Sequence, residues 1–82
     1  MTFSTEALPR NIRFIRTVRG ITQDDLADRC DVSRNTINSY EAGSSTPGIS
    51  VSLKLADSLG VSLNDLLETS YVERAKRRLL SE

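Results

Sequence analysis

The chain has 82 residues, of which 38% are hydrophobic, and its eleven basic and eleven acidic residues give a formal net charge of zero. This length suits one small domain, and the hydrophobic content suffices for a core. One cysteine and no histidine exclude an internal disulfide and argue against a zinc site and most acid–base catalysis, so we expect no metal, no cofactor and no enzymatic activity. Without a long apolar run or a signal-peptide pattern, a cytoplasmic protein with no membrane contact is expected.

The first third of the chain predicts a flexible segment followed by one amphipathic helix. Residues 1–7 are polar and uncapped and are expected to fray, within a flexible segment 1–9. Pro9 suits the first turn of a helix that Gly20 ends in a left-handed conformation. The apolar face of this helix is expected to comprise Ile12, Phe14, Ile15 and Val18. Its cations recur every third residue as a slowly rotating basic stripe, Arg10, Arg13, Arg16 and Arg19.

Two short helices separated by a tight turn are predicted next. Thr22 is a good N-cap for the first, which ends near Asp31, and Ser33 is a good N-cap for the second. The inward positions are Leu26, Ala27 and Cys30 in the first helix, and Ile37 and Tyr40 in the second. The outward surface of the second helix carries Arg34, Asn35, Thr36, Asn38 and Ser39. Solvated helix faces usually favour Glu and Lys, which are absent from residues 34–39.

The remaining chain predicts a loop and three more helices. Residues 42–48 are loop-forming, Ser50 is expected to cap a fourth helix, and Gly60 closes it. Ser62 and Asp65 form a short-armed capping box for a brief fifth helix. Inward positions of these two helices are expected to be Leu53, Ala56 and Leu59, then Leu63, Leu66 and Leu67. A last amphipathic segment covers about residues 70–80, so the fold class is all-α, with no strand-like alternation.

The spacing within residues 22–41 defines a helix-turn-helix rather than a generic helical hairpin, because Ala27 is small where the axes approach and Val32 packs back from the turn. The chain contains an ordered set of residues at characteristic spacing: Gly20-Ile21-Thr22-Gln23, Leu26-Ala27, Val32-Ser33, Ile37, Glu41-Ala42-Gly43, Pro47, Leu53, Ala56, Leu59 to Leu63 and Leu66-Leu67. This set resembles the Cro/repressor (xenobiotic-response-element) family. The resemblance implies a lambda-repressor-like DNA-binding domain at 10–67, a compact bundle of five short helices, with a C-terminal helix within 68–82.

The resemblance also implies roles for individual side chains. The third helix would enter the major groove, with base-reading positions at Arg34, Asn35, Asn38 and Ser39. The phosphate-contacting positions would be Thr22, Gln23, Thr36, Ser44, Thr46, Arg13 and Arg19. Arg16 and Glu41 would form a structural ion pair between the first helix and the end of the recognition helix.

Three residues have a structural interpretation that we prefer. Asp31 stands where the family often has glycine, and aspartate tolerates a left-handed conformation. Tyr40 replaces an aliphatic residue and is expected to pack in the core. Cys30 is expected to act as a small buried hydrophobe rather than as a redox switch.

The predicted function is a transcriptional regulator, in particular a repressor, that binds a palindromic double-stranded operator as a homodimer. Candidate interface residues are Val61, Leu63, Leu66, Leu67, Tyr71, Val72 and Leu79, and the alternative is that the last helix folds back on its own domain. RNA polymerase is a candidate protein partner. Two other functions stay open, the antitoxin of a toxin–antitoxin pair, with the toxin as partner, and a protein-interaction module that does not bind DNA.

Overall fold

The computed structural model describes residues 2–80 and confirms an all-α fold over that range. A short 3-10 turn, η1 (Thr5–Ala7), precedes six α-helices. These are α1 (Leu8–Val18), α2 (Gln23–Cys30), α3 (Arg34–Ala42), α4 (Ile49–Leu59), α5 (Leu63–Leu67) and α6 (Tyr71–Leu80). Within these residues no helix is long and apolar enough to cross a membrane.

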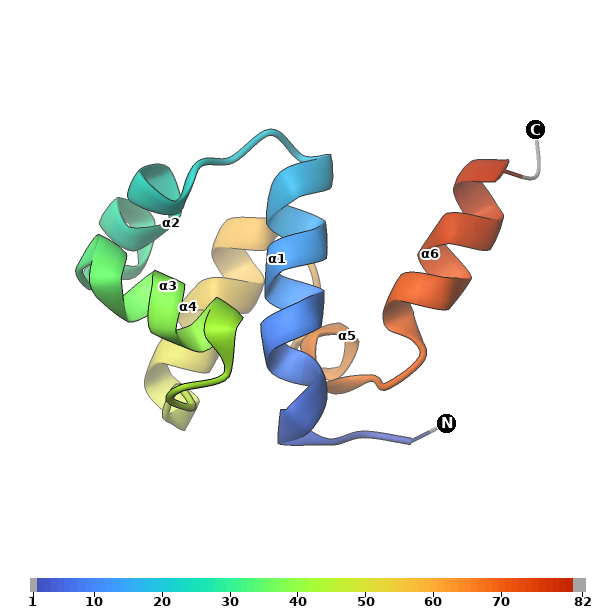
Figure 1. Cartoon of the computed structure of the whole chain (residues 1–82), viewed down its shortest axis with the longest axis horizontal. Helices are drawn as coiled ribbons and strands as arrows, with labels where there is room; N and C mark the ends of the chain where they lie inside the picture. Colours follow the sequence, from blue (N-terminus) through green and yellow to red (C-terminus); the bar gives the residue numbers. More distant parts are fainter. Residues whose placement is uncertain (1, 81–82) are drawn as a thin grey trace.

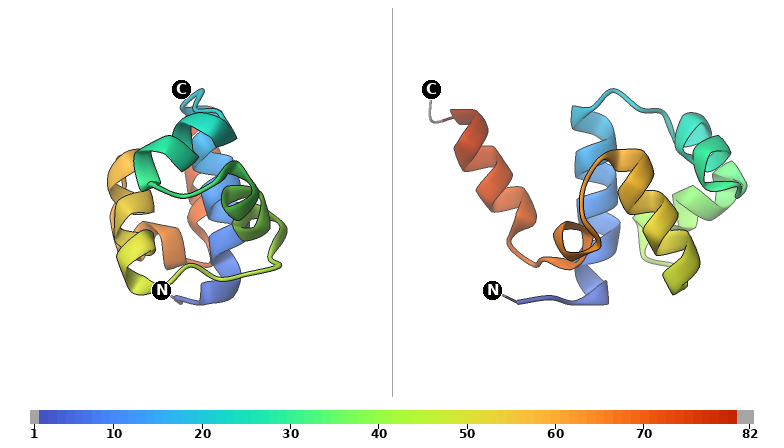
Figure 2. Two further views of the ribbon diagram at one scale, coloured as in Figure 1. Left: turned by 90° about the vertical axis from the view of Figure 1, so that its left-hand side faces the viewer. Right: turned by 180° about the vertical axis from the view of Figure 1, so that it is seen from behind.

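Helix α1 is the central element of the arrangement. In Figure 1, α2 and α3 lie on one side of α1 and α6 lies on the other. Figure 2 shows α4 on the opposite side of the bundle from α3, with α5 close to the N-terminal half of α1. Helices α1 to α5 therefore enclose one core, and α6 is attached to it through α1.

Side-chain caps determine where three of the helices begin. The hydroxyls of Thr22, Ser33 and Ser62 each accept a hydrogen bond from the backbone N–H three residues later, at 3.0–3.2 Å. The Asp65 carboxylate accepts from the Ser62 N–H at 3.3 Å and completes the predicted capping box. Asp31 ends α2 with φ 59°, so the expected left-handed aspartate is confirmed.

The start and the inward face of α4 differ from the prediction. Helix α4 begins at Ile49 with Gly48 as its N-cap, whereas Ser50, the predicted cap, lies inside the helix. Leu53, predicted to face inward, is 54% exposed. Leu55 is buried in its place, because the buried positions follow the i, i+3, i+4, i+7 pattern as Ser52, Leu55, Ala56 and Leu59.

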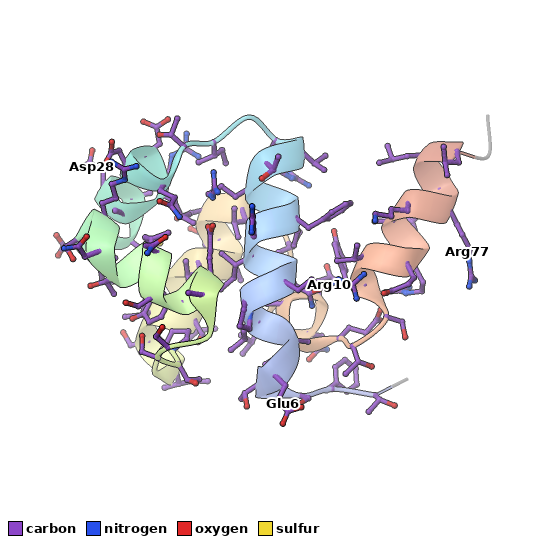
Figure 3. All side chains as sticks on the ribbon, viewed as in Figure 1. Glu6, Arg10, Asp28 and Arg77 are labelled. Atoms are coloured by element: carbon purple, nitrogen blue, oxygen red, sulfur yellow. The ribbon has the colours of Figure 1, made fainter. Side chains whose placement is uncertain are left out.

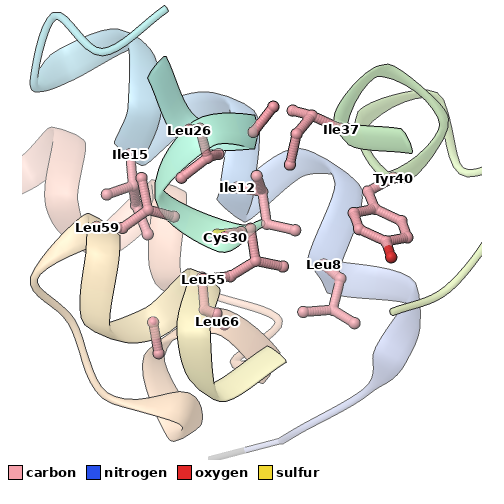
Figure 4. Packing of buried hydrophobic residues seen from close by; sticks show 12 residues of the cluster. Leu8, Ile12, Ile15, Leu26, Cys30, Ile37, Tyr40, Leu55, Leu59 and Leu66 are labelled. Atoms are coloured by element: carbon pink, nitrogen blue, oxygen red, sulfur yellow. The ribbon is translucent and has the colours of Figure 1, made fainter. Parts of the chain in front are cut away.

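The core lies between α1, α2, α3, α4 and α5 (Figure 4). Its fully buried apolar side chains are Ile12, Leu26, Ile37, Leu55, Leu59 and Leu66. The Tyr40 ring points from α3 toward Leu8, and Cys30 is buried, as both were expected to be. Burial raises the pKa of the Cys30 thiol, against smaller opposing effects of a hydrogen bond with Ser58 and of nearby cations. The prediction for Val18 is wrong, since this side chain is 55% exposed near the end of α1.

The segment before α1 is joined to the linker between α5 and α6, although residues 1–9 were expected to be flexible. The Ser4 N–H donates to the Leu67 carbonyl at 2.8 Å, and the Thr69 N–H donates to the Thr2 carbonyl at 3.0 Å. Ser4 also accepts from the Glu6 N–H and so begins η1. Met1 lies outside the described residues. The added order comes from partners more than sixty positions away in the sequence.

Buried polar contacts attach the base of α6 to the bundle. The Asn11 side-chain amide donates to the carbonyls of Leu66 at 2.9 Å and Glu68 at 2.8 Å. Glu68 is buried, and its carboxylate accepts two hydrogen bonds from Arg74 at 2.7 and 2.5 Å. Val72 is also buried. The first turns of α6 therefore pack on the chain's own domain, as the fold-back alternative predicted.

This packing corrects two of the proposed dimer-interface residues. Leu66 and Val72 are 0% and 3% exposed within the chain itself, so they offer no surface to a second copy. Leu66 fills the core under α1, and Val72 lies in the first turn of α6. Ser81 and Glu82, at the end of the predicted 68–82 segment, lie outside the described residues.

Candidate DNA-binding interface

Helices α2 and α3 pack against each other across a three-residue turn. The left-handed Asp31 redirects the chain, and the Val32 N–H then donates to the Ala27 carbonyl at 3.0 Å. Ala27 is 4% exposed, which fits its place at the close approach of the two helices. Both helices start with a capping hydroxyl, from Thr22 and Ser33. The geometry is a helix-turn-helix with α3 as the second helix.

The outer surface of α3 is polar and accessible. Arg34, Asn35 and Asn38 are exposed and Ser39 is half-buried. The Arg34 side chain is 66% exposed, and its Nε lies 3.9 Å from an oxygen of the equally exposed Asp24. Because exposed pairs at this distance contribute little, the guanidinium is available to another acceptor.

A hydrogen-bonded network runs from α1 through α3 to α2. Arg16 Nε and Nη2 donate to the two oxygens of Glu41 at 2.6 and 3.0 Å, so the expected pair is present as a fork. The hydrogen bond with Glu41 raises the pKa of Arg16. Gln23 Nε2 donates to Glu41 Oε1 at 3.2 Å and to Asn38 Oδ1 at 3.3 Å. The network holds Asn38 from its carbonyl side, which leaves the amide hydrogens of Asn38 for an outside acceptor.

The network also changes the expected role of Gln23. Both hydrogens of its amide are directed at protein acceptors, Glu41 and Asn38. Its backbone N–H, at the first position of α2, has no intrahelical acceptor and remains suited to an anion. The Thr22 hydroxyl accepts from the Asp25 N–H and keeps its own hydrogen to donate.

The loop after α3 lies against the end of the recognition helix. The Ser44 N–H donates to the Ser39 carbonyl at 2.9 Å, and the Ser44 side chain is exposed. Thr46 is exposed beside a hollow that Glu6 also lines, so an acid lies near this candidate phosphate donor. The Thr36 hydroxyl is 2.9 Å from that of Ser33 and belongs to the N-cap of α3.

The two arginines predicted to contact phosphate lie in different places. Arg13 is exposed and lines a hollow together with Glu41, close to the C-terminal end of α3. Arg19 lies by the end of α4, where a Cβ on Gly60 would come within 2.7 Å of its Nη1. That end of α4 is on the other side of the bundle from α3 (Figure 2), so Arg19 is not brought together with the other candidates. Arg19 follows the last helical residue of α1, and there it meets the C-cap of α4.

Sequence reasoning did not foresee that Gln23 points into the protein, nor that Asn11, Glu68 and Arg74 form an anchor. The Gln23–Glu41 contact spans 18 positions and the Asn11–Glu68 contact spans 57. A signal existed for the first contact, because helix-turn-helix spacing brings the start of one helix near the last turn of the other. We find no signal in the sequence for the second.

Two capped helices in this arrangement, with a polar outer face on the second, define a DNA-binding helix-turn-helix protein. The helix-turn-helix family HTH_3 matches residues 12–66. The chain belongs to this family, as the resemblance predicted. It is thus a DNA-binding, non-enzymatic transcriptional regulator of the Cro/repressor type, with a lambda-repressor-like fold.

Relatives and solved structures agree with the assignment. An uncharacterized HTH-type transcriptional regulator from Methanocaldococcus jannaschii is 32% identical over 72% of this chain and 89% of its own length. The transcriptional repressor RstR of the cryptic phage CTXphi, from Vibrio cholerae, is 32% identical over 83% of this chain and 64% of its own length.

Two crystal structures share the fold at somewhat lower identity. The restriction-modification controller protein C.AhdI from Aeromonas hydrophila is 26% identical, covers 74% of this chain and 92% of its own, and has a TM-score of 0.71. The P22 c2 repressor, in complex with a synthetic operator, is 27% identical over 76% of this chain and 94% of its own, with a TM-score of 0.72.

Proposed function

We propose that this protein is a repressor that binds a palindromic operator as a homodimer and places the N-terminal half of α3 in the major groove. The observation that carries the proposal is the polar outer face of α3, which the Arg16–Glu41–Gln23 network holds in a fixed orientation to α1 and α2. By occupying its operator, the protein would deny the promoter to RNA polymerase in the cytoplasm, where its target DNA lies.

The side chains of α3 offer complementary means of reading bases. Arg34 can donate in a fork to the O6 and N7 atoms of guanine, and Asn35 can pair with the N6 and N7 atoms of adenine. Asn38, held at its carbonyl by Gln23, offers its amide hydrogens to an acceptor such as a purine N7. Ser39 adds a shorter donor and acceptor. Each bidentate pair contributes about 1–3 kcal/mol of discrimination.

The contacts that position the protein on the sugar–phosphate backbone would be mainly uncharged. We assign them to the Thr22 hydroxyl, the backbone N–H of Gln23, and the side chains of Thr36, Ser44 and Thr46, with Arg13 as the cation. Because few cations lie on this face, the logarithm of the affinity should fall only shallowly with the logarithm of the salt concentration. Base contacts and dimerisation would then supply most of the affinity.

The surface that we assign to dimerisation lies on α4 and α5. Ile49 and Leu53, one turn apart on α4, are 71% and 54% exposed, an arrangement typical of a partner surface. The half-buried apolar residues on the neighbouring α5 region are Val61, Leu63 and Leu67. A two-fold pairing through this surface would present two copies of α3 to half-sites one helical turn apart.

Sedimentation equilibrium combined with footprinting on selected DNA tests this proposal. We expect a dimer that protects two symmetric half-sites about 10 base pairs apart, centre to centre. Leu53→Ser changes an exposed residue and should leave the fold intact, yet give a monomer that binds the same DNA at least ten-fold more weakly. Leu79→Ser, an exposed leucine on α6, is the matched control and should remain dimeric. A wild-type monomer that protects a single half-site would contradict the proposal.

A further inference from the structure

The basic residues of the chain are concentrated on two neighbouring helices. Helices α1 and α6, together with Arg19 directly after α1, carry eight of the eleven basic residues but only one acid, Glu73. Two of the eight are used in buried or half-buried ion pairs, Arg16 with Glu41 and Arg74 with Glu68. The other six are exposed: Arg10, Arg13, Arg19, Lys76, Arg77 and Arg78.

A groove runs between these two helices, which we call the α1–α6 groove. It consists of two hollows of about 490 and 260 Å³, and Phe14 lines both. The larger hollow also has Arg10, Arg13, Val72 and Lys76 in its wall, and at its edge toward α3 it has Glu41, which is paired with Arg16. The smaller hollow is lined by Val18, Arg19, Tyr71, Ala75, Arg78 and Leu79. The groove therefore has apolar side chains along its length and cations on both helices, and its one acid, Glu41, already has a counter-charge in Arg16.

Helix α6 is fixed at its base and splayed at its end. The Glu68–Arg74 pair and a 2.6 Å contact between Arg10 and Glu73 hold its first two turns. Figures 1 and 2 show that its C-terminal half diverges from α1, and there Leu79 and Leu80 are 63% and 84% exposed. In Figure 3 Arg10 reaches toward α6, whereas Arg77 points away from the bundle. Apolar side chains at the open end of the groove are thus left uncovered within the described chain.

We propose that the α1–α6 groove binds an amphipathic helix of another protein, with an apolar stripe flanked by acidic residues. Such a helix would lay its stripe on Phe14, Val18 and Leu79 and direct carboxylates to the cations of α1 and α6. This is the helix-in-groove mode of recognition, here with complementary charge on both sides. The proposal does not rest on DNA binding, because α6 lies on the side of α1 away from α2 (Figure 1), and the smaller hollow is lined by residues 14–19 and α6 alone. The larger hollow reaches Glu41 at the end of α3, so the two surfaces adjoin at Arg13.

Two other occupants match the surface less well. A second copy that brought its own α1 and α6 would place like charges together, and the chain's acidic helix α2 buries its apolar residues, so it lacks a stripe to offer. Phosphates of DNA would match the cations but would gain nothing from Phe14, Val18 or Leu79. Charge and apolar surface together favour an acidic protein helix.

Fluorescence titration of the full chain with designed peptides tests the proposal. The probe is a peptide of 16 residues with a Leu/Phe stripe, glutamates on both flanks and one tryptophan. Because the chain has no tryptophan, the emission reports on the peptide alone. We expect saturable binding with a blue shift, weakened several-fold by added salt. A basic peptide with the same stripe and an acidic peptide with a scrambled stripe should not bind.

Matched variants locate the binding surface. Leu79→Ser and Lys76→Glu should each weaken peptide binding at least five-fold. Lys54→Glu, on α4, makes the same charge change at an exposed lysine elsewhere and should have no effect. The proposal is overturned if the scrambled peptide binds equally well. It is also overturned if no peptide binds. In that case, weaker operator binding by Lys76→Glu would assign the groove to DNA, and a monomeric Leu79→Ser would assign it to a second copy.

Discussion

Arg16 and Glu41 join the first helix to the last turn of the recognition helix through two parallel hydrogen bonds of 2.6 and 3.0 Å. Arg16 also donates to the Ile21 carbonyl at 2.9 Å, which fixes the turn that leads into α2. Glu41 accepts in addition from Gln23. One ion pair therefore sets the position of α3 relative to both preceding helices. Any contact that requires α3 in this orientation depends on that pair.

Removing the Glu41 charge should cost stability. Glu41→Gln leaves the half-buried Arg16 without its counter-charge, and breaking a buried pair in this way costs about 3 kcal/mol. Urea denaturation followed by circular dichroism measures the change in the free energy of unfolding. Glu73→Gln, which breaks the exposed pair with Arg10, is the control and should have a much smaller effect. Equal stability of wild type and Glu41→Gln would show that the pair is dispensable.

Burial on α1 can be tested with two neighbouring aliphatic residues. Ile15 is 2% exposed and Val18 is 55% exposed, although the sequence pattern places both on the apolar face. Ile15→Ala should lower the free energy of unfolding by about 3 kcal/mol, because it leaves a cavity in the core. Val18→Ala should change it by less than about 0.5 kcal/mol. Similar losses for the two variants would contradict the observed register of α1.

The anchor of α6 predicts a local effect. Arg74→Met removes the only ion-pair partner observed for the buried Glu68 within residues 2–80, so the linker before α6 should no longer hold that helix in place. Amide hydrogen exchange should accelerate in α6, while the amides of α1 to α4 should still exchange only as slowly as global unfolding allows. Uniform acceleration throughout the chain would instead mean that α6 unfolds together with the core.

Local signals in the sequence predicted much of this fold. The caps at Thr22, Ser33 and Ser62 depend on residues three positions apart, and the left-handed Asp31 depends on its own backbone, so all four were predictable. The start of α4 was not, because Gly48 caps it without a side chain while the nearby Ser50 offered a more typical cap.

Long-range packing explains what the sequence did not reveal. The order of residues 2–7 depends on the linker after α5, and the burial of Glu68 depends on Asn11 and Arg74. At the candidate site, the residue types on α3 follow from helical spacing, but the position of Arg19 depends on which helix end lies beside it in space. Periodicity identifies the face of a helix and gives no information on such partners.

The buried thiol predicts a pH dependence of stability. Because burial raises the pKa of Cys30 in the folded chain, the unfolded chain loses its thiol proton first as the pH rises. The contribution of the buried, protonated thiol to the free energy of unfolding is complete below the pKa of the unfolded chain, about 8.5. It is lost as the pH rises through the higher pKa of the folded chain. The free energy of unfolding of the wild type should thus fall more steeply above about pH 8.5 than that of Cys30→Ala. Parallel curves in urea titrations across this range would contradict the assignment.

The most direct test of the central claim is selection of bound sequences from a random DNA pool, with the wild type and Arg34→Ala in parallel. We expect the wild type to enrich one palindromic consensus. Arg34→Ala should lose the base preference at one symmetric pair of positions, keep the others, and bind the consensus about 5- to 150-fold more weakly, the equivalent of 1–3 kcal/mol. If both proteins enriched the same consensus with equal affinity, α3 would not be the element that reads DNA.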